Sequence, residues 1–337
     1  MEDANENNKE LWLLFQDLSK AYDRVDLKFL KMALERIKVP SSFTKMLINL
    51  FTNRKNSVFT EFGNTDLYNI KIGIDQEEVI SSLLWIIYYD PLLCEIQNHS
   101  LGYTMTYTWK QDIFRYETST LTQEIPSLAF IDDTTWIAPS QNNLEKILDI
   151  ADDFYRITNT AINKDKSKLI TNKKIQSDNI DLKFGDNSIN IEISKEPIRF
   201  LGVWISLNKQ NSKVTKMVKE EIKKFTNIIK RKPITDKQMG YIVNMVLIPL
   251  VTYRLQNTIL SQNSCNELMA PVRKMFKNKL KFASTAPNCL TQGSQFYNVT
   301  DLWQTQLKRH SSYLITIFNS DKLLYKVAKI RLFQLQH

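Results

Sequence analysis

Two short apolar runs that end on aspartate constrain this chain more than any other feature of its sequence. Residues 11–16 (LWLLFQ) form a continuous apolar run of strand length that ends at Asp17, as is typical of a central strand buried on both faces. Residues 128–131 and 134–138 are two further short strands that meet at Asp132–Asp133, which predicts a hairpin. A charge at the end of a buried strand costs free energy unless it is solvated, paired or bound to a metal. The three aspartates are therefore the first candidates for chemistry.

Carboxylates that converge from two strand ends are the ligands that a Mg²⁺ site needs. Hard oxygen ligands bind this cation, and two ions about 4 Å apart can stabilise the entering and leaving oxygens of a phosphoryl transfer. The alternative is ordinary local structure, because a single aspartate after a strand is more often a turn or helix cap, and adjacent aspartates are common at hairpin tips. Taken one at a time, the three residues favour this second interpretation.

The composition excludes several classes of protein. With 337 residues, 43% of them hydrophobic, the chain can build one large or two medium domains, which excludes a disordered tail or a disulfide scaffold. No uninterrupted apolar run reaches the roughly 18 residues of a membrane span, and the best candidate, residues 243–253, predicts a buried helix. The N-terminus (MEDANENNKE) is acidic and polar, unlike a secretion signal, and the three cysteines and three histidines have no zinc spacing. We therefore expect an intracellular protein that is not secreted, in a reducing compartment, without a membrane partner.

The net charge of +9 conceals an asymmetry along the chain. Residues 211–337 contain 21 Lys and Arg against six Asp and Glu, whereas residues 1–210 contain 24 against 30. A basic C-terminal third behind a mildly acidic body predicts a module that binds a polyanion. Lysine-rich helix faces that are merely solvated explain the same composition, so the charge count alone leaves both interpretations open.

The remaining pattern predicts an α+β body followed by helices. Asp26 is the predicted N-cap of a helix that continues to about residue 37. A hairpin around Gly63–Asn64 is expected to pair residues 58–61 with residues 67–74. Helices are further predicted over residues 79–96, 142–160, 214–229, 237–250, 264–283 and 300–318, and strands over 168–171, 187–193 and 199–206. Strands therefore end, and basic helices begin, near residue 208.

Five blocks, in order along the chain, resemble the palm motifs of reverse transcriptases. They are LFQDLSKAYDRVD (residues 14–26), GIDQEEVISSLLW (73–85), AFIDDTTWIA (129–138), INKDKSKLIT (162–171) and IRFLGVWIS (198–206). The first block is most similar to the non-LTR (LINE-type) retrotransposon group. The resemblance implies an α+β right-hand polymerase fold with three parts: an acidic polar tail over residues 1–10, a palm over 11–208 and a basic helical thumb with a C-terminal extension over 209–337. The palm is expected to be a mixed or antiparallel sheet with packed helices.

The resemblance also implies a catalytic centre. Asp17, Asp132 and Asp133 become catalytic metal ligands for two Mg²⁺ ions, with Mn²⁺ as an alternative and the Leu18 carbonyl as a further ligand. Tyr22 stands where the family keeps a bulky aromatic ring, which leaves no room for a ribose 2′-hydroxyl and selects deoxynucleotides. The competing interpretation of Tyr22 is core packing, but its spacing from Asp17 favours the sugar gate.

Further motif residues are expected to bind substrate and primer. Gln76 matches the glutamine that lies near the templating base pair. Lys166 is expected near the triphosphate, where a cation offsets developing charge, although a surface lysine is an equally good interpretation. The segment Phe200, Leu201 and Gly202 resembles the hairpin that holds the primer end.

Three departures from the family pattern reduce the expected activity. Glu77 replaces a glycine whose missing side chain lets nucleic acid approach the backbone, so it is expected to repel phosphate and crowd the groove. Ser82 stands where the family has proline. Only 16 residues precede Asp17, so we expect the upstream fingers segment to be missing and the polymerase to be truncated.

The resemblance thus implies an RNA-directed DNA polymerase of a non-LTR retrotransposon, with an RNA template, a DNA primer and dNTPs as partners. Metal held by Asp17 and Asp132 is expected to lower the pKa of the primer 3′-hydroxyl and to orient its in-line attack on the α-phosphate of a dNTP. The alternative is a catalytically inactive retroelement remnant that only binds nucleic acid. A two-metal nuclease is a third interpretation, which no motif favours over the polymerase. An active element implies a nuclear location.

Overall fold

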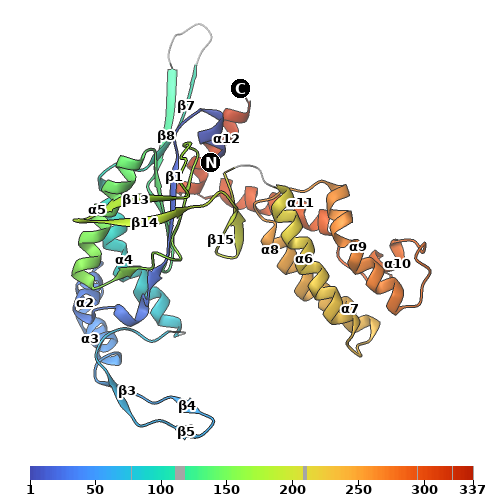
Figure 1. Ribbon diagram of the computed structural model, residues 1–337, viewed down its shortest axis with the longest axis horizontal. Helices are drawn as coiled ribbons and strands as arrows, with labels where there is room; N and C mark the ends of the chain where they lie inside the picture. Colours follow the sequence, from blue (N-terminus) through green and yellow to red (C-terminus); the bar gives the residue numbers. More distant parts are fainter. Residues whose placement is uncertain (77, 111–117, 208–210, 294, 321, 337) are drawn as a thin grey trace. The chain divides into compact units, whose positions relative to one another are not determined.

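The computed structural model describes residues 1–76, 78–110, 118–207, 211–293, 295–320 and 322–336. These residues form two compact units, Met1–Ser194 and Lys195–His337, which are called unit 1 and unit 2 below (Figure 1). The division falls after Ser194, ahead of the change near residue 208 from strands to helices. The last two strands of the chain therefore belong to unit 2. The functional assignment of a palm and a thumb stays a prediction.

Unit 1 is built on a six-stranded sheet with β1 (Trp12–Gln16) at an inner position. The strand order is β13–β14–β12–β1–β10–β9, and all neighbouring strands are antiparallel except β12 and β14. All five residues of β1 are buried, which confirms the prediction of a central strand covered on both faces. The other strands are β9 (Ser127–Phe130), β10 (Asp133–Ala138), β12 (Lys168–Thr171), β13 (Asn179–Phe184) and β14 (Asn187–Ile193).

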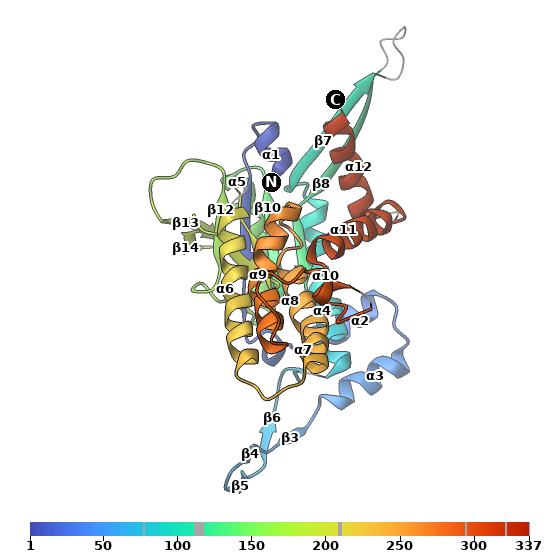
Figure 2. The same ribbon diagram turned by 90° about the vertical axis from the view of Figure 1, so that its right-hand side faces the viewer.

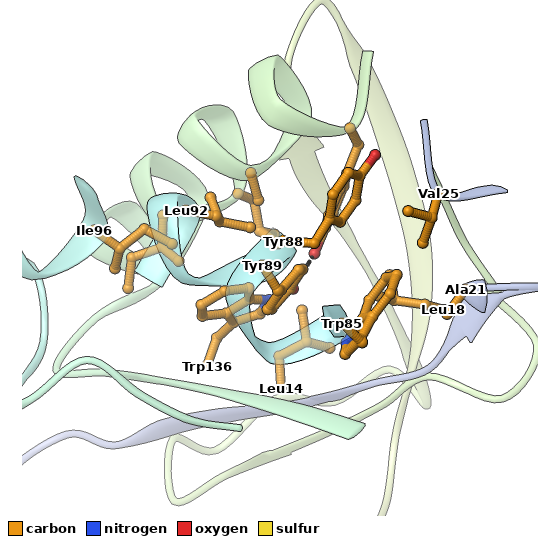
Figure 3. Close-up of a cluster of buried hydrophobic side chains, with 14 of the residues drawn as sticks. Leu14, Leu18, Ala21, Val25, Trp85, Tyr88, Tyr89, Leu92, Ile96 and Trp136 are labelled. Atoms are coloured by element: carbon orange, nitrogen blue, oxygen red, sulfur yellow. Dashed lines mark hydrogen bonds between the residues drawn. The ribbon is translucent and has the colours of Figure 1, made fainter. Parts of the chain in front are cut away.

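Helices α4 (Val79–Asn98) and α5 (Gln141–Thr158) supply much of the core of unit 1 (Figure 1). Figure 3 shows Leu14 and Trp136 from the sheet packed with Trp85 and its neighbours on α4. Side chains on a strand alternate between the two faces of a sheet, so every second residue of β1 points into this core. Apolar and aromatic side chains of α4 and α5 thus pack on this face of the sheet.

The first helices of unit 1 confirm one predicted cap and revise the predicted tail. Asp26 accepts hydrogen bonds from the backbone N–H groups of Lys28 and Phe29, and thereby caps α2 (Leu27–Arg36), as predicted. Helix α3 (Ser41–Leu50) follows α2 and packs against it. The first ten residues differ from a loose polar tail, because α1 (Glu2–Glu6) carries the buried Asp3, which accepts a hydrogen bond of 2.5 Å from the Tyr103 hydroxyl.

Helix α4 is the most apolar long helix of the chain as far as the structure describes it. Its length and its mean hydropathy of 1.5 would allow it to cross a membrane. Among the described residues it is the one helix that meets both conditions. The sequence pattern indicates residues 243–253 as the best candidate for a membrane span and thereby misses α4, but the prediction that residues 243–253 form a buried helix is confirmed. The buried side chains Leu84, Trp85, Tyr88, Tyr89, Leu92 and Ile96 belong to the core of unit 1, which accounts for this composition.

Two hairpins of unit 1 differ from the predicted pattern. The predicted pairing of residues 58–61 with residues 67–74 is wrong: β4 (Phe59–Thr60) pairs with β5 (Gly63–Asn64), and β3 (Arg54–Asn56) pairs with β6 (Tyr68–Ile70). A second hairpin, β7 (Tyr103–Lys110) with β8 (Thr118–Ile125), was not predicted (Figure 1). In β7 threonines alternate with aromatic residues and Met105, and β8 is mostly polar, so neither strand has the apolar run that identifies a buried strand.

Unit 2 consists of one hairpin (Figure 1) followed by helices (Figure 2). The predicted strand over residues 199–206 is wrong as a single element, because β15 (Ile198–Phe200) and β16 (Val203–Ile205) form a hairpin. The helices are α6 (Asn211–Lys230), α7 (Asp236–Ile242), the π-helical turn η2 (Val243–Leu247), α8 (Ile248–Arg254), α9 (Gln262–Lys279), α10 (Cys289–Gln292), α11 (Leu302–Phe318) and α12 (Leu323–Gln336). Apolar faces of α6, α7, α8 and α9 enclose a second core, centred on Val218, Ile222, Val251, Val272 and Phe276.

Candidate active site

The register of β1 and β10 brings two of the predicted aspartates together. Gln16 is paired with Thr134, so the next step of this antiparallel ladder places Asp17 beside Asp133. Directly opposed residues have Cβ atoms about 5 Å apart. Side chains alternate, and Gln16 points into the core under α4 and α5, so Asp17 and Asp133 lie on the opposite face of the sheet.

The pKa of the Asp133 carboxyl reflects the proximity of Asp17. Partial burial raises the pKa of the Asp133 carboxyl above its ordinary value, and the negative charges of Asp132 and Asp17 raise it further. The Asp132–Asp133 dipeptide therefore forms one acidic cluster with Asp17, although 115 residues separate Asp17 from Asp132. The predicted role of these three carboxylates as metal ligands stays a prediction.

Leu18 lies at the same end of the sheet. Strand β2 (Leu18–Ser19) pairs with β11 (Ala161–Ile162), and the Asn163 backbone N–H donates to the Asp17 carbonyl at 2.9 Å. Because successive residues of an antiparallel ladder direct their polar groups to opposite sides, the Leu18 carbonyl points away from β11. The role of this carbonyl as a metal ligand stays a prediction.

Lys166 provides a cation beside this cluster. Its Nζ atom lies 3.9 Å from the Asp17 Oδ2 atom, and its side chain is 71% exposed, so the contact is a loose surface ion pair. The backbone nearby is better fixed, because the Ser167 hydroxyl accepts from the Asp17 N–H at 3.2 Å and donates to the Asn163 carbonyl at 2.8 Å. Lys166 thus lies beside the Asp17 carboxylate, and its role near a triphosphate stays a prediction.

The turn that carries Asp132 has an unusual backbone. Phe130 is paired with Asp133, so Ile131 and Asp132 form a two-residue loop. The predicted hairpin is confirmed, but its tip lies one residue earlier than expected, because Asp133 already belongs to β10. Ile131 has a φ of +58°, a left-handed conformation that β-branched residues rarely adopt.

Tyr22 lies on the core side of this region. Its ring packs against Trp85 of α4, with the ring centroids 5.8 Å apart, and its hydroxyl lies 3.5 Å from the Ser82 hydroxyl. Ser82, which stands in place of the family's proline, thus supplies a polar partner for the Tyr22 hydroxyl. The Ile74 N–H donates to the Tyr22 carbonyl at 2.9 Å and holds the backbone of this residue.

The segment with Gln76 is tied to the same backbone. Gly73 has a φ of +88°, and a Cβ atom at this position would lie 2.8 Å from the Asp23 carbonyl oxygen, so only glycine allows this approach. Gln76 itself is exposed, three residues beyond Gly73. Glu77, the main departure from the family pattern, lies outside the described residues.

The predicted primer-binding segment forms a tight hairpin turn in unit 2. Phe200 is paired with Val203, and Leu201 and Gly202 both have positive φ values, +47° and +79°. The Tyr253 hydroxyl donates to the Leu201 carbonyl at 2.5 Å, and the Arg254 guanidinium donates to the Gly202 carbonyl. The turn is therefore fixed to α8 by two hydrogen bonds to its backbone.

A buried polar network under the aspartates could not be anticipated from the sequence. The Gln16 amide donates to the Tyr155 hydroxyl at 2.6 Å and accepts from the Trp136 indole N–H at 2.9 Å. The Tyr155 and Tyr89 hydroxyls lie 2.6 Å apart, and burial raises the pKa of Tyr89 to about 12. The residues of this network come from β1, β10, α4 and α5, so only the folded chain brings them together. The network links the residue before Asp17 to the strand that follows Asp133.

The acidic cluster fits an open metal site better than a closed one. Among the residues that the structure describes, no group of three or more His, Cys, Asp and Glu side chains forms a metal cage. Mg²⁺ sites that also bind a triphosphate need only one or two carboxylates, since phosphate oxygens and waters supply the other ligands. The negative charges of Asp17 and Asp133 repel each other, and a divalent cation between them would relieve that repulsion.

Comparisons with known proteins give the family of this chain. Residues 1–205 match the family model described as "Reverse transcriptase (RNA-dependent DNA polymerase)". The chain is 21% identical over 297 residues to the retrovirus-related Pol polyprotein from type-1 retrotransposable element R2 of Popillia japonica, an alignment that covers 84% of this chain and 38% of the relative. The chain thus spans well under half the length of this curated relative. The predicted likeness to non-LTR retrotransposon proteins is confirmed.

Solved structures of telomerase are also similar at low identity. Telomerase from Candida albicans, in complex with a fragment of telomeric RNA, has a TM-score of 0.40 at 14% identity and covers 89% of this chain and 51% of its own. Apo telomerase from Candida tropicalis has a TM-score of 0.40 at 12% identity, over 96% of this chain and 55% of its own. The family match, which includes all five motif blocks except the last residue of the fifth, decides the classification. The chain belongs to the reverse transcriptase family, and its fold is the α+β right-hand polymerase fold.

Proposed function

We propose that this chain is the catalytic region of an RNA-directed DNA polymerase from a non-LTR retrotransposon, which adds dNTPs to a DNA primer on an RNA template. The observation that carries the proposal is the pairing of β1 with β10, which places Asp17 beside Asp133 and next to Asp132 on the face of the sheet away from the helices. Family membership supplies the reaction class, and the acidic cluster supplies a place for it.

In this proposal Asp17, Asp132 and Asp133, together with the Leu18 carbonyl, hold two Mg²⁺ ions, for which Mn²⁺ can substitute. When bound, such ions lower the pKa of the primer 3′-hydroxyl and offset charge on the triphosphate. The carboxylates would hold the ions at one end of strands β1 and β10, since these strands cannot slide past each other without breaking the hydrogen bonds around Gln16. Lys166 leaves Asp17 to contact the triphosphate, for which its exposed head group is suited.

Tyr22 would exclude ribonucleotides by filling the space of a 2′-hydroxyl. Its ring is held by Trp85 and by Ser82, so the ring cannot move away to admit the extra oxygen without losing both contacts. Gln76 would contact the templating base pair, and the hairpin turn of Phe200, Leu201 and Gly202 would hold the primer end. The fixed backbone of that turn, with two hydrogen bonds from α8, supports a role in positioning.

The basic helices of unit 2 would grip the template–primer duplex. Helix α6 exposes Lys216, Lys219, Lys223, Lys224 and Lys230. A row of lysines on one helix provides sequence-independent contacts to phosphates, as a polymerase that copies any sequence needs. Because the element copies itself into a genome, the complete protein is expected in the nucleus.

The competing proposal is a retroelement remnant that binds nucleic acid without catalysis. One observation favours it: Glu77 in place of the family's glycine. Both proposals retain the basic helices, so nucleic-acid binding does not distinguish between them. Nucleotide incorporation does.

The test is primer extension with an RNA template, a DNA primer and either dNTPs or rNTPs, in Mg²⁺ and in Mn²⁺. We expect weak dNTP incorporation by the wild-type chain, because a carboxylate at residue 77 disfavours phosphate by about 1 kcal/mol or more. Glu77→Gly should raise incorporation about tenfold, a factor that corresponds to 1.4 kcal/mol. Asp132→Ala in the same background should abolish it.

Two controls make the result specific. Asp66→Ala removes an exposed aspartate from the hairpin of unit 1 and should leave incorporation unchanged. Tyr22→Ala should raise the ratio of rNTP to dNTP incorporation, whereas Tyr68→Ala, which removes an exposed tyrosine of β6, should not. Incorporation that survives Asp132→Ala would contradict the assignment of the metal ligands. A complete lack of incorporation by the wild type and by Glu77→Gly would favour the remnant.

A further inference from the structure

We propose that Trp85 is a positioning residue of this site: its indole N–H holds the strained turn that carries Asp132. The catalytic consequence rests on the proposed function, but the structural claim does not. The indole Nε1 atom donates to the Ile131 carbonyl oxygen at 2.8 Å, across 46 residues of sequence. Ile131 is the first residue of the two-residue loop between Phe130 and Asp133, and Asp132 is the second.

The turn needs such a partner because its first residue is poorly suited to its backbone. Ile131 has a φ of +58°, whereas glycine or asparagine is the usual choice for this region. A β-branched residue in this conformation persists only when the surrounding structure holds it there. The Ile131 carbonyl would otherwise be free to rotate with the peptide plane that joins it to Asp132. A hydrogen bond to that carbonyl therefore fixes the direction in which the Asp132 side chain leaves the turn.

Trp85 is itself held rigidly. It is fully buried, and its ring stacks on Tyr89, with centroids 5.6 Å apart and an angle of 20° between the planes. Tyr89 is in turn fixed by the short hydrogen bond between its hydroxyl and that of Tyr155. Figure 3 shows Trp85 and Tyr89 together on α4, with Trp85 toward the chain segment of Leu18 and Ala21. The donor thus occupies one position, which a mobile surface side chain could not guarantee.

The same indole also contacts the residue proposed to select the sugar. The Tyr22 ring packs on Trp85 at 5.8 Å between centroids, at an angle of 34°. One buried side chain therefore touches both the turn of Asp132 and the ring of Tyr22. This arrangement sets the position of the sugar gate relative to the metal ligands through a single rigid group.

The test compares two conservative substitutions in the full chain. Trp85→Phe keeps an aromatic ring but removes the N–H group. Trp12→Phe is the matched control, since Trp12 is also fully buried in the same core and its indole N–H donates to Glu10, at 2.6 Å. Hydrogen exchange of the peptide covering residues 127–136 is measured at a temperature where both variants are folded. We expect Trp85→Phe to accelerate exchange in this peptide by about fivefold relative to the control, the factor expected for loss of one hydrogen bond.

A second substitution keeps the proposal testable if Trp85→Phe destabilises the whole core. Ile131→Asn places a residue that tolerates positive φ at the turn. Combined with Trp85→Phe, it should return the exchange of the peptide toward the wild-type rate. Equal exchange in Trp85→Phe and Trp12→Phe would overturn the proposal, and so would strictly additive effects of Ile131→Asn and Trp85→Phe.

A measurement of Mn²⁺ binding distinguishes a failure of this proposal from a failure of the proposed function. The free ion is measured by its electron paramagnetic resonance. Weaker binding by Trp85→Phe than by Trp12→Phe, with Asp132→Ala weaker still, would support both. Equal binding by the wild type and Asp132→Ala would refute the metal site and with it the proposed function. In that case the exchange result would still decide whether Trp85 holds the turn.

Discussion

Replacing Asp133 by asparagine should stabilise the protein in the absence of divalent metal. Asp133 lies beside Asp132 and Asp17, and partial burial together with these two charges raises the pKa of its carboxyl. A carboxyl whose pKa is raised by folding costs stability whenever it is ionised. The cost is fully present at pH values above the folded-state pKa, and it vanishes below about 3.8, the ordinary value.

The size of the effect follows from the charges involved. Two unit charges 4 Å apart interact by about 1 kcal/mol in bulk water and by about 4 kcal/mol at the dielectric constant typical near a protein surface. Asp133 is only partly buried, so solvent screening keeps the sum over both neighbours at about 1–2 kcal/mol. For a unit of the length of Met1–Ser194, each kcal/mol changes Tm by about 2–4 °C. Asp133→Asn should therefore raise Tm by about 2–8 °C at pH 7.

The assay is thermal unfolding of the full chain, followed by tryptophan fluorescence in a chelator at pH 7 and at pH 4. The gain in Tm should shrink toward pH 4, because the wild-type carboxyl then becomes protonated. Added Mn²⁺ should raise the Tm of the wild type more than that of the variant, since the cation offsets the same repulsion. Asp66→Asn, an exposed aspartate of unit 1, is the matched control. A Tm for Asp133→Asn no higher than that of this control would refute the argument that the cluster is strained.

Two further measurements test other parts of the molecule. Burial raises the pKa of Tyr89 from 10 to about 12, so the free energy of unfolding should be unaffected below pH 10 and should fall by up to about 3 kcal/mol as the pH approaches 12. Urea unfolding at pH 9 and at pH 11.5 should detect this loss, and Tyr89→Phe should reduce it. The affinity of the full chain for nucleic acid, measured by fluorescence anisotropy, should fall by about 100-fold between 50 and 200 mM salt, as expected for about four phosphate contacts. The double substitution Lys219→Glu and Lys223→Glu on α6 should reduce this affinity far more than Lys45→Glu on α3. An affinity that does not change with salt would contradict the proposed phosphate contacts.

The candidate site could be located from the sequence because Asp17 follows a short apolar strand and Asp132–Asp133 lies at the turn between two others. The run before Asp17 and the hairpin around Asp132–Asp133 are local patterns, and the five motif blocks add their order along the chain. The cap at Asp26 was equally local, since its side chain binds N–H groups two and three residues further on. Where the decisive contacts lie within a few residues, the sequence alone is sufficient.

The parts that could not be predicted depend on contacts between distant segments. No spacing rule joins Trp85 to Ile131, or Gln16 to Tyr155, because these pairs meet only after the helices have packed on the sheet. The β7–β8 hairpin was missed for another reason, since exposed strands with polar residues lack the apolar run that marks a buried strand. The β15–β16 hairpin belongs to unit 2, whereas the sequence pattern groups residues 198–206 with the preceding strands; the boundary between palm and thumb near residue 208 stays a prediction.

The pairing of Gln16 with Thr134 has a consequence for how this protein tolerates changes of length. Gln16 points into the core and Asp17 points out of it, so the two adjacent residues require opposite surroundings. If any one residue between Trp12 and Gln16 were deleted, every side chain of the strand on one side of the deletion would point to the other face of the sheet. That change would either bury the Asp17 carboxylate or expose the aromatic residues of the core. The number of residues in β1 is thus under stricter constraint than the identity of most of them, and a genetic screen that scores single deletions should find this strand intolerant even where substitutions by other apolar residues are accepted.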